Sequence, residues 1–275
     1  MRILIAGGSG YVGRGIIERY CPTHDFINIS LTRYADLAIN NALVDLAKPL
    51  NFLRFDKPID MIINCVECRP EGLTGDERSK RAYLAVVRHL IEYAQDYDVN
   101  KFIHFSVNHI NTVENDYQQA KFVAEGLVKS CGLNYIIFKP TVIFGDNSPL
   151  EYLINSLLSK SVLLKFWKEE ARIAPVHLLD VLANVGYAIE REDCWNETYS
   201  LCGPETMTFE EILFRRRTIK KPKLVSAPAA LAKRSAFKNT PLLPSHLLLL
   251  LDWVGADDGR SAARSLISPQ FFYKH

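Results

Sequence analysis

The sequence has no long apolar run, no marked excess of either charge, and only six cysteines among its 275 residues. The longest unbroken aliphatic stretch is Leu247 to Leu251, whereas a membrane-spanning helix needs roughly 20 apolar residues. We therefore expect no transmembrane segment. Lysine and arginine together number 33 against 31 aspartates and glutamates, and this balance disfavours a surface built to bind nucleic acid.

Glycine and proline are also modest, at 14 and 13 residues, while hydrophobic residues make up 48%. This composition excludes disordered and collagen-like chains. Cys65 and Cys68 form the one close cysteine pair, but no second half-site accompanies them, so packed cysteines in a reducing compartment are favoured over a zinc or redox centre. Met1-Arg2 leads directly into apolar residues, so we expect no signal or transit peptide and a cytoplasmic protein.

Short β-branched runs alternate with longer stretches of helical period, which is typical of βαβ units and a parallel sheet. The expected strands are Arg2–Ala6, Phe26–Thr32, Asp60–Val66, Lys101–Ser106, Asn134–Phe138 and Thr198–Leu201. The expected helices are Val12–Tyr20, Ser79–Tyr97, Tyr117–Ser130, Leu150–Ser159, Leu178–Glu190 and Phe209–Arg217. Thr208 and Glu211 have the spacing of a capping box, which marks the start of the last helix.

These elements predict an α/β fold, a Rossmann-type doubly wound parallel sheet with a small, mainly helical C-terminal lobe. After about residue 204 the chain becomes richer in proline, leucine, lysine and arginine. We therefore divide it into a Rossmann-type domain, 1–203, and a substrate or partner lobe, 204–275, with 146–175 contributing to the cap. A basic patch in the lobe is interpreted as a solvated helix end, with an anchor for an acidic partner as the alternative. The patch consists of Arg215, Arg216, Arg217, Lys220, Lys221 and Lys223.

A glycine-rich loop joins the first expected strand to the first expected helix. Gly7 would allow the tight turn, Gly10 the approach of a pyrophosphate, and Gly13 the close packing of helix on strand. The N–H groups and partial positive charge at the helix start would then face the phosphates. The position of the motif predicts a dinucleotide site. The expected cofactor contacts in this region are Gly7, Ser9, Gly10, Tyr11, Val12, Gly13 and Arg14.

The choice of dinucleotide depends on the end of the second strand, where an acidic residue would bind a ribose 2′-hydroxyl. Arg33 stands at this position, and a guanidinium can pair with a 2′-phosphate. The sequence therefore favours NADP(H). NAD(H) stays open, because a slipped strand end would make Asp36 the ribose ligand.

Tyr117 and Lys121 are four residues apart, so a helix places them on one face. A neighbouring ammonium favours the phenolate form of tyrosine, which suits the phenol to acid–base chemistry near neutral pH. Ser106 ends the strand before this helix, where its hydroxyl could hold a substrate oxygen.

With the glycine loop, Ser106, Tyr117 and Lys121 in this order, the chain resembles the short-chain dehydrogenase/reductase superfamily, in its extended and atypical branches. The resemblance assigns Asp45 and Leu46 to the adenine side of the cofactor, and Asn64, Cys65 and Val66 to the end of a strand beside it. Residues 139–145 look like the family's Arg-Pro-x-x-x-Phe-Gly segment, which implies contacts from Pro140 and Val142. Residues 197–208 are similar to relatives of the accessory NADPH-binding subunit of respiratory complex I.

Two positions depart from the family pattern. Lys139 replaces the usual arginine, and Cys65-Val66-Glu67 follows Asn64 where small residues are usual. The backbone near the nicotinamide is therefore expected to differ from that of typical members.

The resemblance implies an NADP(H)-dependent oxidoreductase or epimerase-like enzyme. Tyr117 would be the general acid/base, Lys121 would lower its pKa and bind the nicotinamide ribose, and Ser106 would orient the reacting oxygen. The substrate would be a small carbonyl or hydroxyl compound, with nucleotide sugars among the candidates. A homodimer is left open, and no metal ligand is expected.

The alternative that the resemblance implies is a non-catalytic, NADPH-stabilised accessory subunit or assembly factor of respiratory complex I. Such a protein would lie peripherally on the inner membrane, on its matrix or cytoplasmic face.

Overall fold

The computed structural model describes residues 1–32, 39–67, 77–108, 116–165, 169, 172–215, 222–226, 263, 264 and 266. The chain forms two compact units. The first consists of Met1–Pro140, Val181–Leu201 and Gly259–Ser268. The second consists of Thr141–Asp180, Cys202–Asp258 and Pro269–His275.

The first unit is built on one sheet of eight parallel strands. They are β1 (Arg2–Ala6), β2 (Asp25–Ser30), β3 (Asn40–Leu43), β4 (Met61–Asn64), β5 (Lys101–Phe105), β6 (Asn134–Pro140), β11 (Glu197–Leu201) and β14 (Ala263–Arg264). Their spatial order is β14-β11-β6-β5-β4-β1-β2-β3. The predicted Rossmann-type parallel sheet is therefore confirmed.

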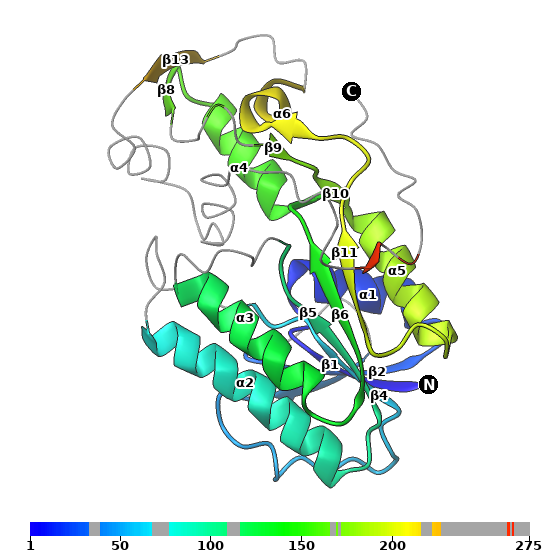
Figure 1. The fold of residues 1–275 in the computed structure, drawn as a ribbon. Helices are drawn as coiled ribbons and strands as arrows, with labels where there is room; N and C mark the ends of the chain where they lie inside the picture. Colours follow the sequence, from blue (N-terminus) through cyan, green and yellow to red (C-terminus); the bar gives the residue numbers. More distant parts are fainter. Residues whose placement is uncertain are drawn as a thin grey trace. The chain divides into compact units, whose positions relative to one another are not determined.

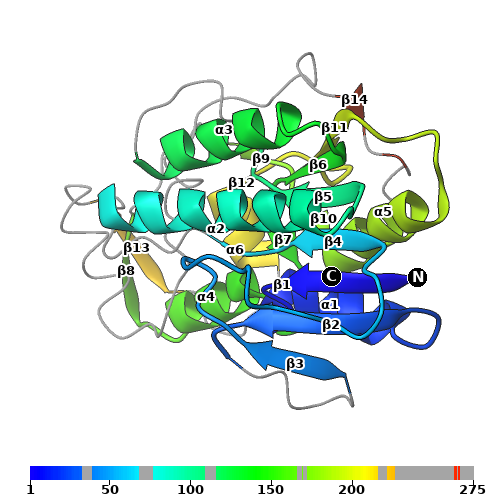
Figure 2. The same ribbon diagram turned by 90° about the horizontal axis from the view of Figure 1, so that it is seen from below.

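Helices cover both faces of this sheet (Figures 1 and 2). They are α1 (Tyr11–Tyr20), α2 (Glu77–Asp96), α3 (Asp116–Lys129) and α5 (Leu178–Glu190). The helices α2 and α3 lie side by side on one face, and α1 and α5 lie on the other. Because both faces are covered, the central strands are almost wholly apolar, and Ile3, Leu4 and Ile5 are fully buried.

The chain reverses its direction of sheet growth between β3 and β4. It runs from β1 outward to β3, then returns to add β4 on the other side of β1. Such a switch point leaves a crevice at the carboxyl ends of the strands, where ligands of these sheets bind. In this chain Gly7 follows β1 at the switch point, and Cys65, which follows β4, donates its N–H to the carbonyl of Ala6 at 2.9 Å.

The second unit contains shorter elements around its own apolar core, which includes Leu153, Leu157 and Phe209. The elements are β7 (Ile143–Phe144), α4 (Pro149–Leu158), β8 (Val162–Lys165), β9 (Arg172–Ile173), β10 (Val176–His177), β12 (Met207–Thr208), α6 (Phe209–Arg215) and β13 (Lys223–Ser226). Three two-stranded sheets pair β7 with β10, β9 with β12, and β8 with β13.

The capping box expected before the last helix is present. The hydroxyl of Thr208 accepts the N–H of Glu211 at 3.1 Å, and the Glu211 carboxylate accepts the N–H of Thr208 at 2.7 Å. This reciprocal pair satisfies two N–H groups at the start of α6.

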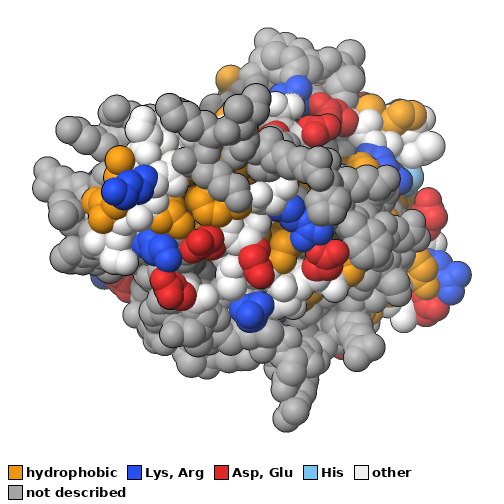
Figure 3. Space-filling view, turned by 90° about the horizontal axis from the view of Figure 1, so that it is seen from above, with side chains coloured by type: hydrophobic (Ala, Val, Ile, Leu, Met, Phe, Trp, Pro, Cys, Tyr) orange, Lys and Arg blue, Asp and Glu red, His pale blue; other side chains and the backbone are white. Residues whose placement is uncertain are grey.

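Most of the predicted basic patch lies outside the described residues, as does Leu247–Leu251. Arg215, the first residue of the basic patch, forms an ion pair with Glu205. On the face shown in Figure 3, the described basic and acidic side chains are interspersed rather than gathered by sign. In the part of the chain that the structure describes, no helix combines the length and the apolar character needed to cross a membrane.

Candidate functional site

The glycine loop forms a cradle that larger residues would fill. Gly7 has a φ of +79°, a conformation that favours glycine, and a side chain there would meet the backbone of Cys65 at 3.1 Å. At Gly13 a Cβ would lie only 2.5 Å from the carbonyl oxygen of Gly7. Gly10 is the N-cap of α1, and its N–H donates to the Gly7 carbonyl at 3.0 Å. Because these residues have no side chains, the loop thus places its backbone directly at the switch point.

A hydrogen-bonded group of amides and hydroxyls surrounds the end of β2. The side-chain oxygen of Asn28 accepts the N–H of Gly8 at 3.0 Å, and its amide donates to the hydroxyl of Ser30 at 3.2 Å. The hydroxyls of Ser9 and Thr32 are 2.8 Å apart. This group ties the glycine loop to the strand whose end would face the adenosine ribose. Gly8 and Asn28 were not singled out from the sequence.

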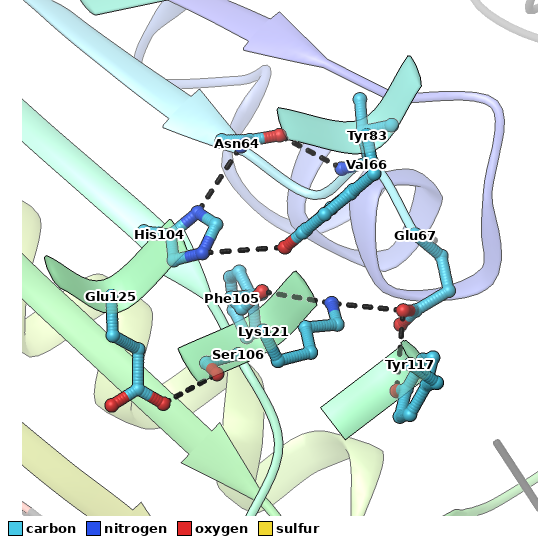
Figure 4. Close-up of polar contacts among 10 residues, drawn as sticks. All are labelled: Asn64, Val66, Glu67, Tyr83, His104, Phe105, Ser106, Tyr117, Lys121 and Glu125. Atoms are coloured by element: carbon cyan, nitrogen blue, oxygen red, sulfur yellow. Dashed lines mark hydrogen bonds and ion pairs between the residues drawn. The ribbon is translucent and has the colours of Figure 1, made fainter. Parts of the chain in front are cut away.

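Tyr117 and Lys121 both contact the carboxylate of Glu67 (Figure 4). The Lys121 ammonium is 2.8 Å from Oε1 of Glu67, and the Tyr117 hydroxyl donates to the same oxygen at 3.3 Å. Tyr117 and Lys121 are buried on α3, whereas the Glu67 side chain is 35% exposed. Burial alone would lower the pKa of Lys121, but the interactions of its ammonium with Glu67 and Tyr83 outweigh burial and raise this pKa. Lys121 is therefore a permanent cation at neutral pH.

Ser106 contacts a different carboxylate. Its hydroxyl donates to Glu125 at 2.6 Å, and the ammonium of Lys139 lies 3.4 Å from the same oxygen of Glu125. All three side chains are buried. In Figure 4 Ser106 points to Glu125, while Tyr117 and Lys121 point to Glu67.

A third buried group lies between α2 and the neighbouring strands. His104 is fully buried, and its two ring nitrogens lie 3.1 Å from the amide of Asn64 and 3.4 Å from the hydroxyl of Tyr83. Burial, with the nearby positive charge of Lys121, lowers the pKa of His104 to about 3. The imidazole is therefore neutral and serves as a hydrogen-bonding member of the core.

This arrangement follows the plan of a known family, whose model, the NAD dependent epimerase/dehydratase family, matches residues 3–201. The chain belongs to this family. The superfamily resemblance seen in the sequence is thereby confirmed.

One curated relative of this epimerase/dehydratase family member is the mitochondrial 40 kDa subunit of NADH-ubiquinone oxidoreductase from Neurospora crassa, 30% identical over 154 residues. The matched stretch covers 51% of this chain and 39% of the relative, so the chain spans about two fifths of that protein's length.

Solved structures of UDP-glucose 4-epimerases share the fold. The Thermotoga maritima structure with UDP-glucose is 15% identical and has a TM-score of 0.68, covering 91% of this chain and 97% of that one. The Thermus thermophilus complex with NAD is 14% identical and has a TM-score of 0.65, covering 91% and 98%. At these identities the likeness shows the fold alone.

Several other residues expected at the cofactor site have local structural partners. Asp45 accepts the N–H of Ala47 at 3.1 Å and so closes a turn, and the carbonyl of buried Leu46 lies 3.2 Å from Nδ1 of His89. Val66 donates its N–H to the side chain of Asn64 at 3.0 Å.

The remaining expected residues lie at element ends or outside the described residues. Burial raises the pKa of the Cys65 thiol. Arg14 pairs with Glu18 on the surface of α1. Pro140 ends β6, and Val142 lies in the core of the second unit. Arg33, Asp36 and Cys68 lie outside the described residues.

Of the expected set, the structure brings the glycine loop, Asn64, Tyr117 and Lys121 to the carboxyl edge of one sheet. Glu67 was not expected to take part. The available signal was its place in the Cys65-Val66-Glu67 run, which departs from the family's small residues.

Proposed function

We propose that this family member binds NADP(H) at its glycine loop and uses Tyr117 and Lys121 in an oxidoreductase or epimerase-like reaction. The observation that carries the proposal is the cradle itself: glycines that cannot be replaced without a clash, opening a helix at the switch point of the sheet. The pyrophosphate would be held by N–H groups at the start of α1.

Three features support NADP(H) over NAD(H). The hydroxyls of Ser9 and Thr32 lie together at the end of β2, where they can donate to phosphate oxygens. Arg33 follows them in the sequence and supplies a fixed positive charge. Among the described residues, the side chains that form hydrogen bonds at this strand end are neutral amides and hydroxyls rather than carboxylates, which suits a phosphate.

In the proposed chemistry, the cofactor supplies or accepts a hydride, and the protein handles the proton. Tyr117 would exchange a proton with the substrate oxygen, assisted by the positive charge of Lys121. Because Ser106 donates its own proton to Glu125, its lone pairs are the part left for a ligand, which suits it to accept a hydrogen bond from a substrate hydroxyl. The substrate class is a small carbinol or carbonyl compound, with nucleotide sugars as first candidates, in a cytoplasmic setting.

Tyr117→Phe tests this proposal. We expect wild-type protein to turn over a member of a nucleotide-sugar and carbonyl panel with NADP(H), and the phenylalanine variant to lose about 100-fold or more in kcat, since general acid–base catalysis contributes 10²–10⁴-fold. Tyr97→Phe, at the residue that follows the end of α2, is the matched control and should leave turnover unchanged. If the Tyr117→Phe variant turns over substrate at the wild-type rate, the role assigned to Tyr117 is excluded.

A second candidate function is a cofactor-stabilised accessory subunit of a complex I-like assembly, peripheral to a membrane. The match to the 40 kDa subunit of NADH-ubiquinone oxidoreductase favours it. Under this proposal NADP(H) raises stability by binding the folded state, and Tyr117→Phe leaves assembly unchanged. Co-purification with a large respiratory complex supports this candidate, whereas a free protein with turnover opposes it.

A further inference from the structure

Glu67 lies where it can compete with the cofactor. The proposed function gives Lys121 the task of binding the nicotinamide ribose, but in the structure the Lys121 ammonium is paired with the Glu67 carboxylate at 2.8 Å. Glu67 also accepts from Tyr117 at 3.3 Å. One carboxylate thus holds both members of the pair (Figure 4).

The surroundings of Lys121 leave little capacity for a second ligand. An ammonium has three protons to donate. The Glu67 carboxylate accepts one of them, and the carbonyl oxygen of Phe105 lies 3.5 Å from Nζ in a different direction. The ring of Tyr83 covers a third side, with its centroid 4.7 Å from Nζ. A ribose hydroxyl that bonds to Lys121 therefore has to replace one of these partners.

Glu67 is the partner able to leave. Phe105 is a strand residue and its carbonyl is fixed, and Tyr83 is buried on α2. Glu67 follows the end of β4, and its side chain is 35% exposed, so its carboxylate can turn to water without uncovering a buried charge of its own.

We infer that Glu67 sets the affinity of this chain for the ribose of the nicotinamide half of the cofactor by competing for Lys121. This inference rests on the proposed function. The charged carboxylate makes a stronger hydrogen bond to the ammonium than a neutral hydroxyl does, so the Glu67-bound form dominates without cofactor. The apparent affinity then falls in proportion to the fraction of protein in which Lys121 is available.

The same competition links cofactor binding to Tyr117. While Glu67 is paired, its negative charge offsets the charge of Lys121 beside the phenol, and phenolate formation is disfavoured. Release of Glu67 restores the attraction of Lys121 for a phenolate. Pairing with Glu67 therefore weakens the effect of Lys121 on the Tyr117 phenol until the site is filled.

The test compares the affinities of wild-type protein, Glu67→Gln and Glu67→Ala for three ligands by titration calorimetry. NADP⁺ and 2′-phospho-ADP-ribose carry the second ribose, whereas 2′,5′-ADP lacks it. We expect both variants to bind the first two ligands about tenfold more tightly than wild type, because the competing form is removed. Affinity for 2′,5′-ADP should change by less than about twofold, since that ligand does not reach Lys121.

Glu92→Gln removes an exposed carboxylate from α2 and is the matched control, expected to bind all three ligands as wild type does. An equal gain for 2′,5′-ADP would overturn the inference, because it would indicate a general electrostatic effect. Wild-type and Glu67 variants that bind NADP⁺ equally would also overturn it while leaving the proposed function intact. If none of the proteins binds any nucleotide, both the proposed function and the inference are excluded.

Discussion

Two ion pairs join α3 to residues of the sheet or of the segments that follow its strands. Glu125 of α3 pairs with Lys139 of β6, and Lys121 of α3 pairs with Glu67, which follows β4. An unpaired buried charge is costly, so each pair ties α3 to the strand edge that it covers. The hydroxyl of Ser106 donates to Glu125 and that of Tyr117 donates to Glu67, so these two carboxylates orient both hydroxyls.

At Lys139 the charge matters more than the side chain that carries it. Lys139→Met leaves Glu125 buried without its cation and should lower the free energy of unfolding by about 3–5 kcal/mol. Lys139→Arg restores the residue usual in the family and should retain most of the stability. Urea denaturation of the two variants measures the difference, and equal loss in both would show that the ion pair is not the cause.

His104 gives the stability a defined pH dependence. Its pKa is about 3 in the folded protein, against about 6.5 in an unfolded chain. Between these values the unfolded state binds a proton that the folded state does not, so this group lowers stability by about 1.4 kcal/mol for each pH unit below 6.5. Above pH 6.5 the imidazole is neutral in both states and contributes no slope.

The measurement is urea unfolding of wild type and His104→Gln at pH 7.5, 6.0 and 4.5. We expect the variant to lose less stability than wild type as the pH falls. Parallel curves for the two proteins would mean that His104 is protonated in the folded state as readily as in the unfolded one.

Among elements, the helices α1 and α3 each contain a glycine, but only the one in α1 is required by its surroundings. Gly13 is required because a Cβ would overlap the Gly7 carbonyl, whereas a Cβ at Gly126 on α3 would meet nothing within 4 Å. A glycine in an open helical position weakens the helix relative to alanine.

These two glycines provide a matched pair of variants. Gly13→Ala should destabilise the protein by about 1–3 kcal/mol, since the clash is with backbone. It should also abolish saturable NADP⁺ binding. Gly126→Ala should stabilise by about 0.5–1 kcal/mol and leave binding unchanged. Thermal unfolding with and without NADP⁺ measures both, and a Gly13→Ala protein that binds normally would remove the loop from the site.

The longer elements could be predicted from sequence because their periodicity is local. Every expected strand and helix is present, with ends within two residues of those expected. The two-residue strands β7, β9, β12 and β14 were not expected, since so short a segment has no readable alternation. The four-residue edge strand β3 was also missed, because its composition, Asn-Asn-Ala-Leu, is not that of a typical strand.

The same limit applies to the site. The i, i+4 spacing of Tyr117 and Lys121 is local, so helix geometry predicts that they lie on one face. The carboxylates that hold them and Ser106 come from 50 and 19 residues away in the chain, and only the folded sheet brings them together. Glu67 and Glu125 were for this reason not among the predicted site residues.

For the whole molecule, the described residues of the candidate site lie in the first compact unit. The glycine loop, Glu67, Tyr117 and Lys121 all belong to Met1–Pro140. The family match extends over residues 3–201 and so includes every one of them. Nucleotide binding is therefore the property on which both candidate functions and the role of Glu67 depend.

The most direct test is titration calorimetry of the purified full chain with NADP⁺ and with NAD⁺, alongside Gly13→Ala. We predict saturable binding at one site per chain, tighter for NADP⁺ than for NAD⁺, and its loss in the alanine variant. Absence of saturable binding of either nucleotide to the wild-type chain, or binding that Gly13→Ala leaves unchanged, would contradict the account.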